Sequence, residues 1–197
     1  VGGAGQKITC SVVMKANRIL HLDGDSFFAS CEIALHPEWQ GRPLWVGGGR
    51  RGDGIVIAAN RLAKQFGIAT GMACFEAKSR CPHGVLARPS YDEYRRLSQA
   101  MFRIIEGYSP TLVPISIDEG FVDLSTMAAH VWRNTTPKLY VDGIRERIAK
   151  DLKLPVSGGL ANSARLAKLA TDVELETFAQ PATVPSVGEP FCLETYP

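Results

Sequence analysis

The sequence predicts an α+β fold, and three observations support that prediction. Short apolar runs bounded by glycine, proline or acidic residues are typical of strands. Longer segments carry apolar residues at helical spacing. The order along the chain is a strand, an inserted segment, and then helix, strand, strand, helix, strand and helix. Without the insert and the last helix this order is βαββαβ, which is the ferredoxin-like pattern.

The first strand is expected at residues 18–25, where the apolar run RILHLDGD stops in acid and glycine. Residues 26–35 have helical spacing, and Ser26 is a candidate N-cap because its side chain can accept a backbone hydrogen bond. The segment 42–46 predicts a second strand. The stretch GGGRRGDG at 47–54 predicts a glycine-rich, basic turn or loop.

A strand at 55–59 and a short helix at 60–67, closed by Gly67, complete the predicted insert. The next helix, at 91–110, has a strong amphipathic pattern. Its apolar face consists of Leu97, Met101, Ile104 and Ile105.

The second half of the chain predicts the remaining strands and helices. Residues 111–125 predict two strands that meet near 118–120. Proline begins the next helix, at 137–152, because its missing N–H is tolerated in a first helical turn. A strand is expected at 154–161 and a short helix at 162–172.

Composition narrows the class of protein. The chain has 197 residues and is 45% hydrophobic, which suits a globular protein of one or two domains. The net charge of +2 does not by itself indicate nucleic-acid binding. There is no apolar run long enough for a membrane span. The five cysteines are odd in number and form no C-x-x-C pair, which favours reduced thiols in a cytoplasmic protein.

Three carboxylates are expected to meet at one edge of the predicted sheet. The βαββαβ topology places the first strand beside the central hairpin, so Asp23 should lie near Asp118 and Glu119. Buried carboxylates are costly unless a cation neutralises them, and Mg²⁺ prefers such oxygen ligands. The alternative is that Asp118 and Glu119 form a solvated turn. Asp25 is interpreted as a turn or cap residue.

Four motifs and one spacing carry a resemblance to a known family. The motifs LHLDGDSFFASCE, GIVIAANRLAKQFGIATGM, SIDEGFVDLS and GGLANSARLAKLATD occur in this order, and the spacing from Ser98 to the YSP at Tyr108 lies between the second and the third. Together they resemble Y-family (translesion) DNA polymerases over residues 15–172. The residues in these motifs leave open whether the chain resembles the polymerase IV-like (DinB) or the polymerase V-like (UmuC) branch more closely.

The resemblance implies a domain organisation. Residues 15–26 and 90–173 would form the palm, a ferredoxin-like unit, and residues 27–89 the small α/β fingers. The leading residues 1–14 would be a tag or a disordered leader, and 174–197 a linker or the start of a thumb. The thumb and little finger of the family would otherwise be absent, so the chain would be a catalytic-core fragment.

The resemblance also implies a two-metal site. Asp23, Asp118 and Glu119 would be the catalytic metal ligands, with a backbone carbonyl at Leu22 or Gly24 as a further oxygen. Two Mg²⁺ ions, or Mn²⁺ in their place, would bind the incoming triphosphate and the primer 3′-hydroxyl. Catalysis would consist of positioning and charge stabilisation.

Substrate contacts follow from the same motifs. Phe28 falls at the steric-gate position, where a ring excludes a ribose 2′-hydroxyl. Phe27 is adjacent, so one of the two rings can belong to the core while the other faces the site. Ala164 stands where the family usually has a lysine. The implied nucleotide-binding residues are Phe27, Phe28, Arg61, Lys64, Arg165 and Lys168, and the implied DNA-binding residues are Arg50 and Arg51.

The expected function is therefore template-directed DNA synthesis past damaged bases, in the DNA repair and SOS response. The partners would be primer–template DNA, deoxynucleoside triphosphates and a sliding clamp bound through regions outside this chain, and no membrane. One alternative is a weak or inactive accessory protein of the DNA-damage response that keeps the fold as a binding platform. Another is a nucleotidyl cyclase on a similar fold, which the insert and Phe28 disfavour.

Overall fold

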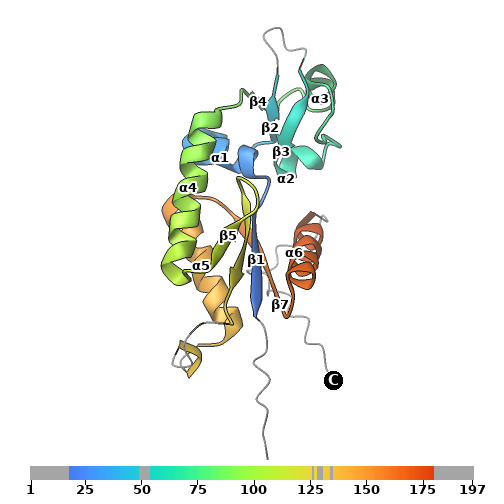
Figure 1. Ribbon diagram of the computed structural model, residues 1–197. Coiled ribbons are helices and arrows are strands. Elements are labelled where there is room, and N and C mark those ends of the chain that lie inside the picture. Colours follow the sequence, from blue (N-terminus) through green and yellow to red (C-terminus); the bar gives the residue numbers. More distant parts are fainter. Residues whose placement is uncertain (1–17, 49–53, 126, 128–130, 134, 180–197) are drawn as a thin grey trace, which may run out of the picture.

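The computed structural model has a mixed α+β architecture, as the sequence predicts. It describes residues 18–48, 54–125, 127, 131–133 and 135–179. A four-stranded sheet occupies the lower half of the molecule and a three-stranded sheet the upper half (Figure 1). Within the described residues, no helix is both long and apolar enough to cross a membrane.

In the larger sheet the first strand lies beside the hairpin, as the sequence predicts. The strands of this sheet are β1 (Ile19–Gly24), β5 (Leu112–Pro114), β6 (Glu119–Asp123) and β7 (Val156–Ala161), arranged β5-β6-β1-β7. Every neighbouring pair is antiparallel. Helices α4 (Tyr91–Tyr108) and α5 (Pro137–Leu152) make the connections, so the sequence β1-α4-β5-β6-α5-β7 is βαββαβ. The central position of β1 is what brings its last residues next to β6.

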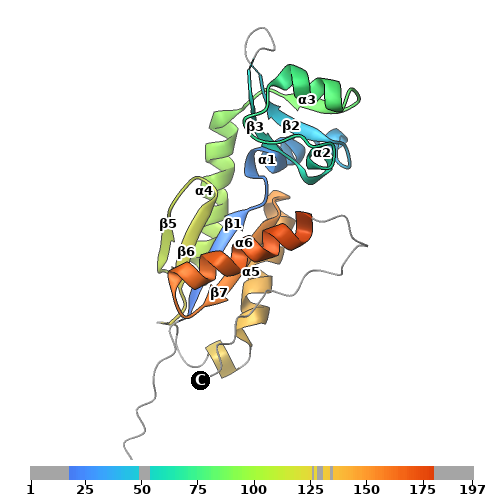
Figure 2. The same ribbon diagram turned by 90° about the vertical axis from the view of Figure 1, so that its right-hand side faces the viewer.

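Helices cover both faces of this sheet. Helices α4 and α5 lie together on one face, and α6 (Ala164–Ala179) crosses the other face over β1 and β7 (Figures 1 and 2). Because side chains alternate along a strand, Leu20 and Leu22 face the core under α4 and α5, whereas His21 faces α6. This alternation places His21 and Asp23 on the same side of the sheet.

The smaller sheet has the order β3-β2-β4. Its strands are β2 (Leu44–Gly47), β3 (Val56–Ala59) and β4 (Val85–Ala87), and the accompanying helices are α1 (Phe27–Leu35), α2 (Arg61–Lys64) and α3 (Cys74–Arg80). Two single 3₁₀ turns occur at Pro37–Trp39 and Val131–Arg133. The sequence patterns did not predict α3 or β4, because seven and three residues are too few for a period to emerge.

The main hydrophobic core is continuous between the two sheets. Leu20 of β1, Phe27 of α1 and Leu44 of β2 belong to one buried cluster together with residues of α4 and α5. A second, smaller cluster lies around Trp45 between the small sheet and its helices. The core therefore contains residues from both sides of the predicted boundary at residue 26. The predicted domain boundaries remain predictions.

Some local predictions require correction. Ser26 occupies the N-cap position of α1, but it adopts a left-handed conformation (φ 47°) and its side chain makes no capping bond. The predicted helix at 60–67 is a helix only over Arg61–Lys64, and Gly67 closes the following turn with a φ of 71°. Helix α6 continues to Ala179, seven residues past its predicted end at residue 172. Arg50 and Arg51 lie outside the described residues.

Asn60 joins three segments of the upper half. Its Oδ1 accepts the N–H groups of Leu44 (3.0 Å) and Ala63 (2.9 Å), and its Nδ2 donates to the carbonyl of Arg42 (2.8 Å). The side chain is buried. Asn60→Ala should therefore lower the free energy of unfolding by about 2–3 kcal/mol, because it leaves buried backbone groups without partners.

Urea denaturation measures this effect, and Asn60→Asp is the matched comparison. The aspartate keeps both acceptor contacts but loses the donor to Arg42, so an intermediate loss is expected. If Asn60→Ala unfolds within about 0.5 kcal/mol of the unmodified protein, the hydrogen bonds of Asn60 contribute little.

Candidate active site

Three carboxylates meet where β1 and β6 reach the edge of the larger sheet. Asp23 is directly opposite Glu119 in the antiparallel register. The N–H of Gly24 donates to the carbonyl of Asp118 over 3.0 Å. A Cβ added to Gly24 would lie 3.5 Å from the Cβ of Asp118, which shows how closely the two segments approach. The structure thus brings Asp23, Asp118 and Glu119 together.

A hydroxyl group that the sequence analysis did not single out organises the turn before β6. Ser116 Oγ donates to Asp118 Oδ1 over 2.5 Å and accepts the N–H groups of Asp118 and Glu119, each over 3.2 Å. Serine followed two residues later by aspartate is typical of such side-chain-capped turns. Ser116 therefore holds the carboxylate of Asp118 and the backbone of Glu119 in one local structure.

The electrostatics of the cluster are unfavourable to a full set of negative charges. Burial, followed by the nearby charges of Asp118 and Glu119, raises the pKa of Asp23 to about 7. The hydrogen bond from Lys168 Nζ to Glu119 Oε2, 2.6 Å long, lowers the pKa of Glu119. Lys168 thus neutralises the negative charge of Glu119. The region around Asp23 remains suited to an added cation.

The three carboxylates are suited to a metal ion that also takes ligands from a substrate. Within the described ranges, no three His, Cys, Asp or Glu side chains form a ready metal cage. Asp118 faces Ser116, and Glu119 faces Lys168. Mg²⁺ keeps several waters and is commonly held by one or two carboxylates together with substrate phosphates. An arrangement of separate carboxylates beside a pocket with basic side chains fits that type of site.

Such a pocket lies directly beside Asp23. It has a volume of about 510 Å³ and reaches from the end of β1 to α2. Its walls include Asp23, Gly24, Ser26, Arg61 and Lys64. The ammonium group of Lys64 donates to Ser26 Oγ over 3.1 Å, which joins α2 to the start of α1. The two predicted cations of the insert therefore share a pocket with the first carboxylate.

Leu22 and Gly24, whose carbonyls are both candidate metal ligands, have different positions in the structure. Leu22 is paired on both sides, with Gly120 of β6 and Gly158 of β7, so its backbone lies inside the sheet. Gly24 ends β1 and lines the pocket. Of these two residues, only Gly24 lines the pocket beside Asp23, and the metal-binding role of either carbonyl remains a prediction.

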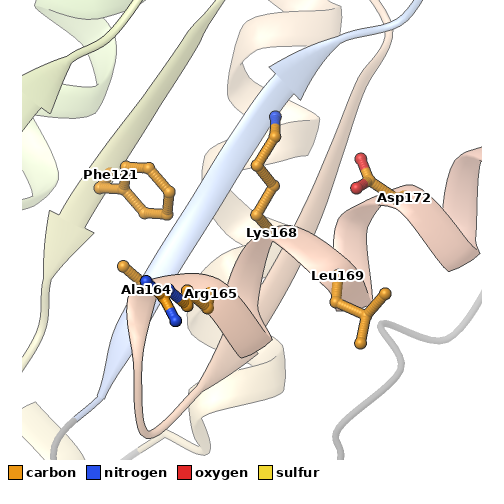
Figure 3. Close-up of a pocket in the computed structure, with 6 residues that line it drawn as sticks. All are labelled: Phe121, Ala164, Arg165, Lys168, Leu169 and Asp172. Atoms are coloured by element: carbon orange, nitrogen blue, oxygen red, sulfur yellow. The ribbon is translucent and has the colours of Figure 1, made fainter.

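Arg165 lies in a different place from Arg61 and Lys64. It lines an open groove of about 380 Å³ on α6, together with Phe121, Ala164, Lys168, Leu169 and Asp172 (Figure 3). In Figure 3 the side chain of Lys168 extends over β1, whereas Arg165 lies near Ala164, one turn earlier. Lys168 reaches the carboxylate cluster, and Arg165 does not line the pocket beside Asp23.

The two adjacent phenylalanines have different environments, as the sequence predicts. The side chain of Phe27 is only 3% exposed and belongs to the main core, so it is not available to a nucleotide. Phe28 is half-buried and stacks on Tyr94 with a centroid distance of 4.8 Å, while Tyr91 approaches its edge. The hydroxyl of Tyr94 donates to the buried Glu32 over 2.5 Å. Tyr94 and Glu32, which the sequence patterns did not identify, thus fix the orientation of the Phe28 ring.

Comparison with known families gives one match over most of the chain. The model of the impB/mucB/samB family matches residues 22–172. Among curated proteins, DNA polymerase IV 1 of Bacillus subtilis is 37% identical over 161 residues, which is 81% of this chain and 38% of that protein. DNA polymerase IV of Ralstonia nicotianae is 34% identical over 155 residues, covering 79% of this chain and 43% of the relative.

Solved structures give the same result. The crystal structure of DinB from Sulfolobus solfataricus matches with a TM-score of 0.73 and 26% identity, over 79% of this chain and 45% of that one. An insertion ternary complex of Dbh DNA polymerase matches with a TM-score of 0.72 and 26% identity, over 79% of this chain and 46% of that one. This chain spans less than half the length of these relatives.

Proposed function

Because the chain belongs to the impB/mucB/samB family, which is a Y-family polymerase domain, we propose that it is the catalytic core of a translesion DNA polymerase. The observation that carries the proposal is the convergence of Asp23, Asp118 and Glu119 beside a pocket with Arg61 and Lys64. Carboxylates for metal ions beside cations for phosphates are the set that nucleotidyl transfer requires. The primer 3′-oxygen would bond to the α-phosphorus of the triphosphate, and the bond to pyrophosphate would break.

Each part of the molecule receives a role in this proposal. The β5-β6-β1-β7 sheet with α4, α5 and α6 would be the palm, and residues 27–89 the fingers. The thumb and little finger would correspond to the part of the relatives that this chain does not match. The protein would act in the cytoplasm, during the SOS response, on primer–template DNA, and would meet a sliding clamp through such further regions.

Three side chains and one backbone carbonyl would hold divalent ions. These are the carboxylates of Asp23, Asp118 and Glu119 and the carbonyl of Gly24. When bound, Mg²⁺ or Mn²⁺ would neutralise the triphosphate and favour ionisation of the primer hydroxyl. The carboxylates themselves position the reacting groups, and the buried setting of Asp23 makes its charge dependent on a cation.

Residues of the pocket and of the neighbouring elements α1 and α6 would bind and select the nucleotide. Arg61 and Lys64 would pair with phosphate oxygens. The first turn of α1 offers backbone N–H groups that Ser26 does not cap, and a helix N-terminus favours anions. Phe28, held against Tyr94, would contact the sugar and exclude a 2′-hydroxyl. Lys168 would keep Glu119 ionised.

Calorimetry with nucleotide and metal tests this function on the chain itself. A deoxynucleoside triphosphate should bind in the presence of Mg²⁺, and EDTA or Asp118→Ala should weaken binding by at least about 100-fold. The corresponding ribonucleotide should bind less tightly. Phe28→Ala should remove most of that difference, because the ring that clashes with the 2′-hydroxyl is gone, while Phe75→Ala, at an exposed phenylalanine of α3, is the aromatic control.

Three outcomes would count against the proposal. Binding that persists in EDTA, or that ignores Asp118→Ala, would separate the nucleotide from the carboxylates. Cyclic product formed from nucleotide without DNA would indicate a cyclase. Metal and nucleotide binding without extension of a supplied primer–template would favour the accessory role.

A further inference from the structure

A buried histidine lies beneath the carboxylate cluster. His21 is in the middle of β1 on the same side of the sheet as Asp23, and its side chain is 0% exposed. Its Nδ1 is 3.0 Å from Thr171 Oγ1 of α6, and its Nε2 is 3.5 Å from Glu119 Oε2. The ring of Phe121 packs against it with a centroid distance of 4.6 Å. Both ring nitrogens therefore face defined polar groups in a closed environment.

The ring of His21 is completely buried, a setting that favours an uncharged imidazole. A neutral imidazole has one N–H donor and one acceptor nitrogen. Which nitrogen carries the proton is decided by the groups that the two nitrogens face.

The neighbours of His21 select one tautomer. If the proton were on Nδ1, the lone pair of Nε2 would face the carboxylate oxygen of Glu119, and two acceptors would oppose each other in a buried site. If the Thr171 hydroxyl donates to Nδ1, the proton is on Nε2 and points at Glu119. Thr171 Oγ1 also lies 3.1 Å from the carbonyl of Ala167 and 3.4 Å from the carbonyl of His21, so its single proton has three possible acceptors. The carboxylate favours donation to Nδ1 of His21.

We propose that Thr171 holds His21 in its Nε2–H tautomer and that His21 thereby positions the carboxylate of Glu119. This inference rests on the proposed function, in which Glu119 is a metal ligand. Lys168 and His21 both approach the same oxygen, Oε2, so the other oxygen, Oε1, is left for a metal ion. Histidine–carboxylate contacts of this kind orient ligands in many metal sites.

Lys168 alone could not fix the orientation of that carboxylate. Its side chain is 44% exposed and its ammonium is a mobile point charge. The ring of His21 is instead immobilised by Phe121, Thr171 and the sheet. The 3.5 Å separation exceeds an ordinary N–H···O distance, and Nε2 has no closer partner among the described residues. A buried N–H in that state would gain free energy from a shorter contact with the carboxylate.

Two pairs of variants separate this role from simple packing. Glutamine places an N–H donor near the Nε2 position, whereas asparagine reproduces only the Nδ1 position, so His21→Gln can reach Glu119 and His21→Asn cannot. Thr171→Ser keeps the hydroxyl, and Thr171→Val removes it at nearly constant shape. His21→Gln should keep the Mn²⁺ affinity of the metal-titrated protein within about threefold, while His21→Asn should weaken it by about 10–100-fold.

A metal-free measurement tests the same inference independently. Side-chain ¹⁵N–¹H spectra of the histidines, assigned by comparison with His21→Gln, should show the proton of His21 on Nε2. Thr171→Val should shift the population toward Nδ1–H, and Glu119→Gln should shift the Nε2 proton resonance. A proton on Nδ1 in the unmodified protein, or no response to Glu119→Gln, would overturn the inference.

The two readouts distinguish a failed inference from a failed function. If the unmodified chain does not bind Mn²⁺ at all, the metal site of the proposed function fails, and the spectra alone decide whether His21 contacts Glu119. If it binds Mn²⁺ and His21→Asn binds equally well, the positioning role fails while the metal site stands.

Discussion

Asp23→Asn is expected to stabilise the metal-free protein at pH 8 while it abolishes metal-dependent nucleotide binding. In the folded state Asp23 is buried beside Asp118 and Glu119, and this environment raises its pKa from 3.8 to about 7. Keeping it ionised therefore opposes folding, by roughly 2–4 kcal/mol at pH 8. Asparagine has nearly the same shape without the charge, so it removes that penalty.

The pH dependence gives this prediction a definite sign. Between its ordinary pKa and about 7, Asp23 is ionised in the unfolded chain but holds its proton in the folded chain. The free energy of unfolding contributed by this group therefore falls as the pH rises from about 4 to 7, and is constant above that. The advantage of Asp23→Asn should be complete at pH 8 and absent below about pH 4.

Urea denaturation in EDTA at both pH values measures the stability effect, with Asp92→Asn as control. Asp92 has a 95% exposed side chain, so its substitution should change little at either pH. In Mg²⁺ the same Asp23→Asn protein should bind a deoxynucleoside triphosphate at least about 100-fold more weakly. A destabilised Asp23→Asn protein at pH 8 would mean that its carboxylate makes a contact that outweighs its burial.

Gly159→Ala is expected to lower the free energy of unfolding by about 3 kcal/mol or more, because α6 lies directly on β7 at this position. An added Cβ would be 2.2 Å from the carbonyl oxygen of Ala167 and 2.6 Å from the N–H nitrogen of Thr171. These are backbone atoms of a helix and cannot move aside separately. The helix must shift as a whole, and with it Lys168 and Thr171.

Gly143→Ala is the matched control for this prediction. Gly143 lies within α5, and an added Cβ there would meet nothing within 4 Å. The substitution should raise the free energy of unfolding by about 0.5–1 kcal/mol, because alanine favours the helix. Chemical denaturation of both variants measures the contrast. An equally mild effect of Gly159→Ala would show that α6 is loosely held on the sheet.

The sequence by itself predicted most of the larger sheet. The apolar runs of β1 and β7 and the amphipathic face of α4 are patterns of local periodicity, which a single chain displays without knowledge of its partners. The βαββαβ order then sufficed to expect Asp23 beside Asp118 and Glu119, since few topologies accommodate that order. The family motifs depend on the same residues, and the match over residues 22–172 confirms the family.

Short elements and side-chain environments were decided by the tertiary structure. Strand β4 exists because it pairs with β2, and its three residues carry no pattern of their own. The sequence treated Arg165 and Lys168 alike, but the position of α6 on the sheet directs only Lys168 to Glu119. Contacts between segments that are distant in sequence, such as those of Phe28 with Tyr94 and His21 with Thr171, depend on packing.

The sequence thus determined which residue types and which topology are present, because hydrophobic period and chain order are local properties. Only the tertiary structure decided which oxygen of Glu119 faces Lys168 and that Gly24 lines the pocket. It also showed that the charge of Asp23 is unfavourable without a cation. These properties depend on burial and on distances between neighbouring side chains, and folding alone brings such groups together.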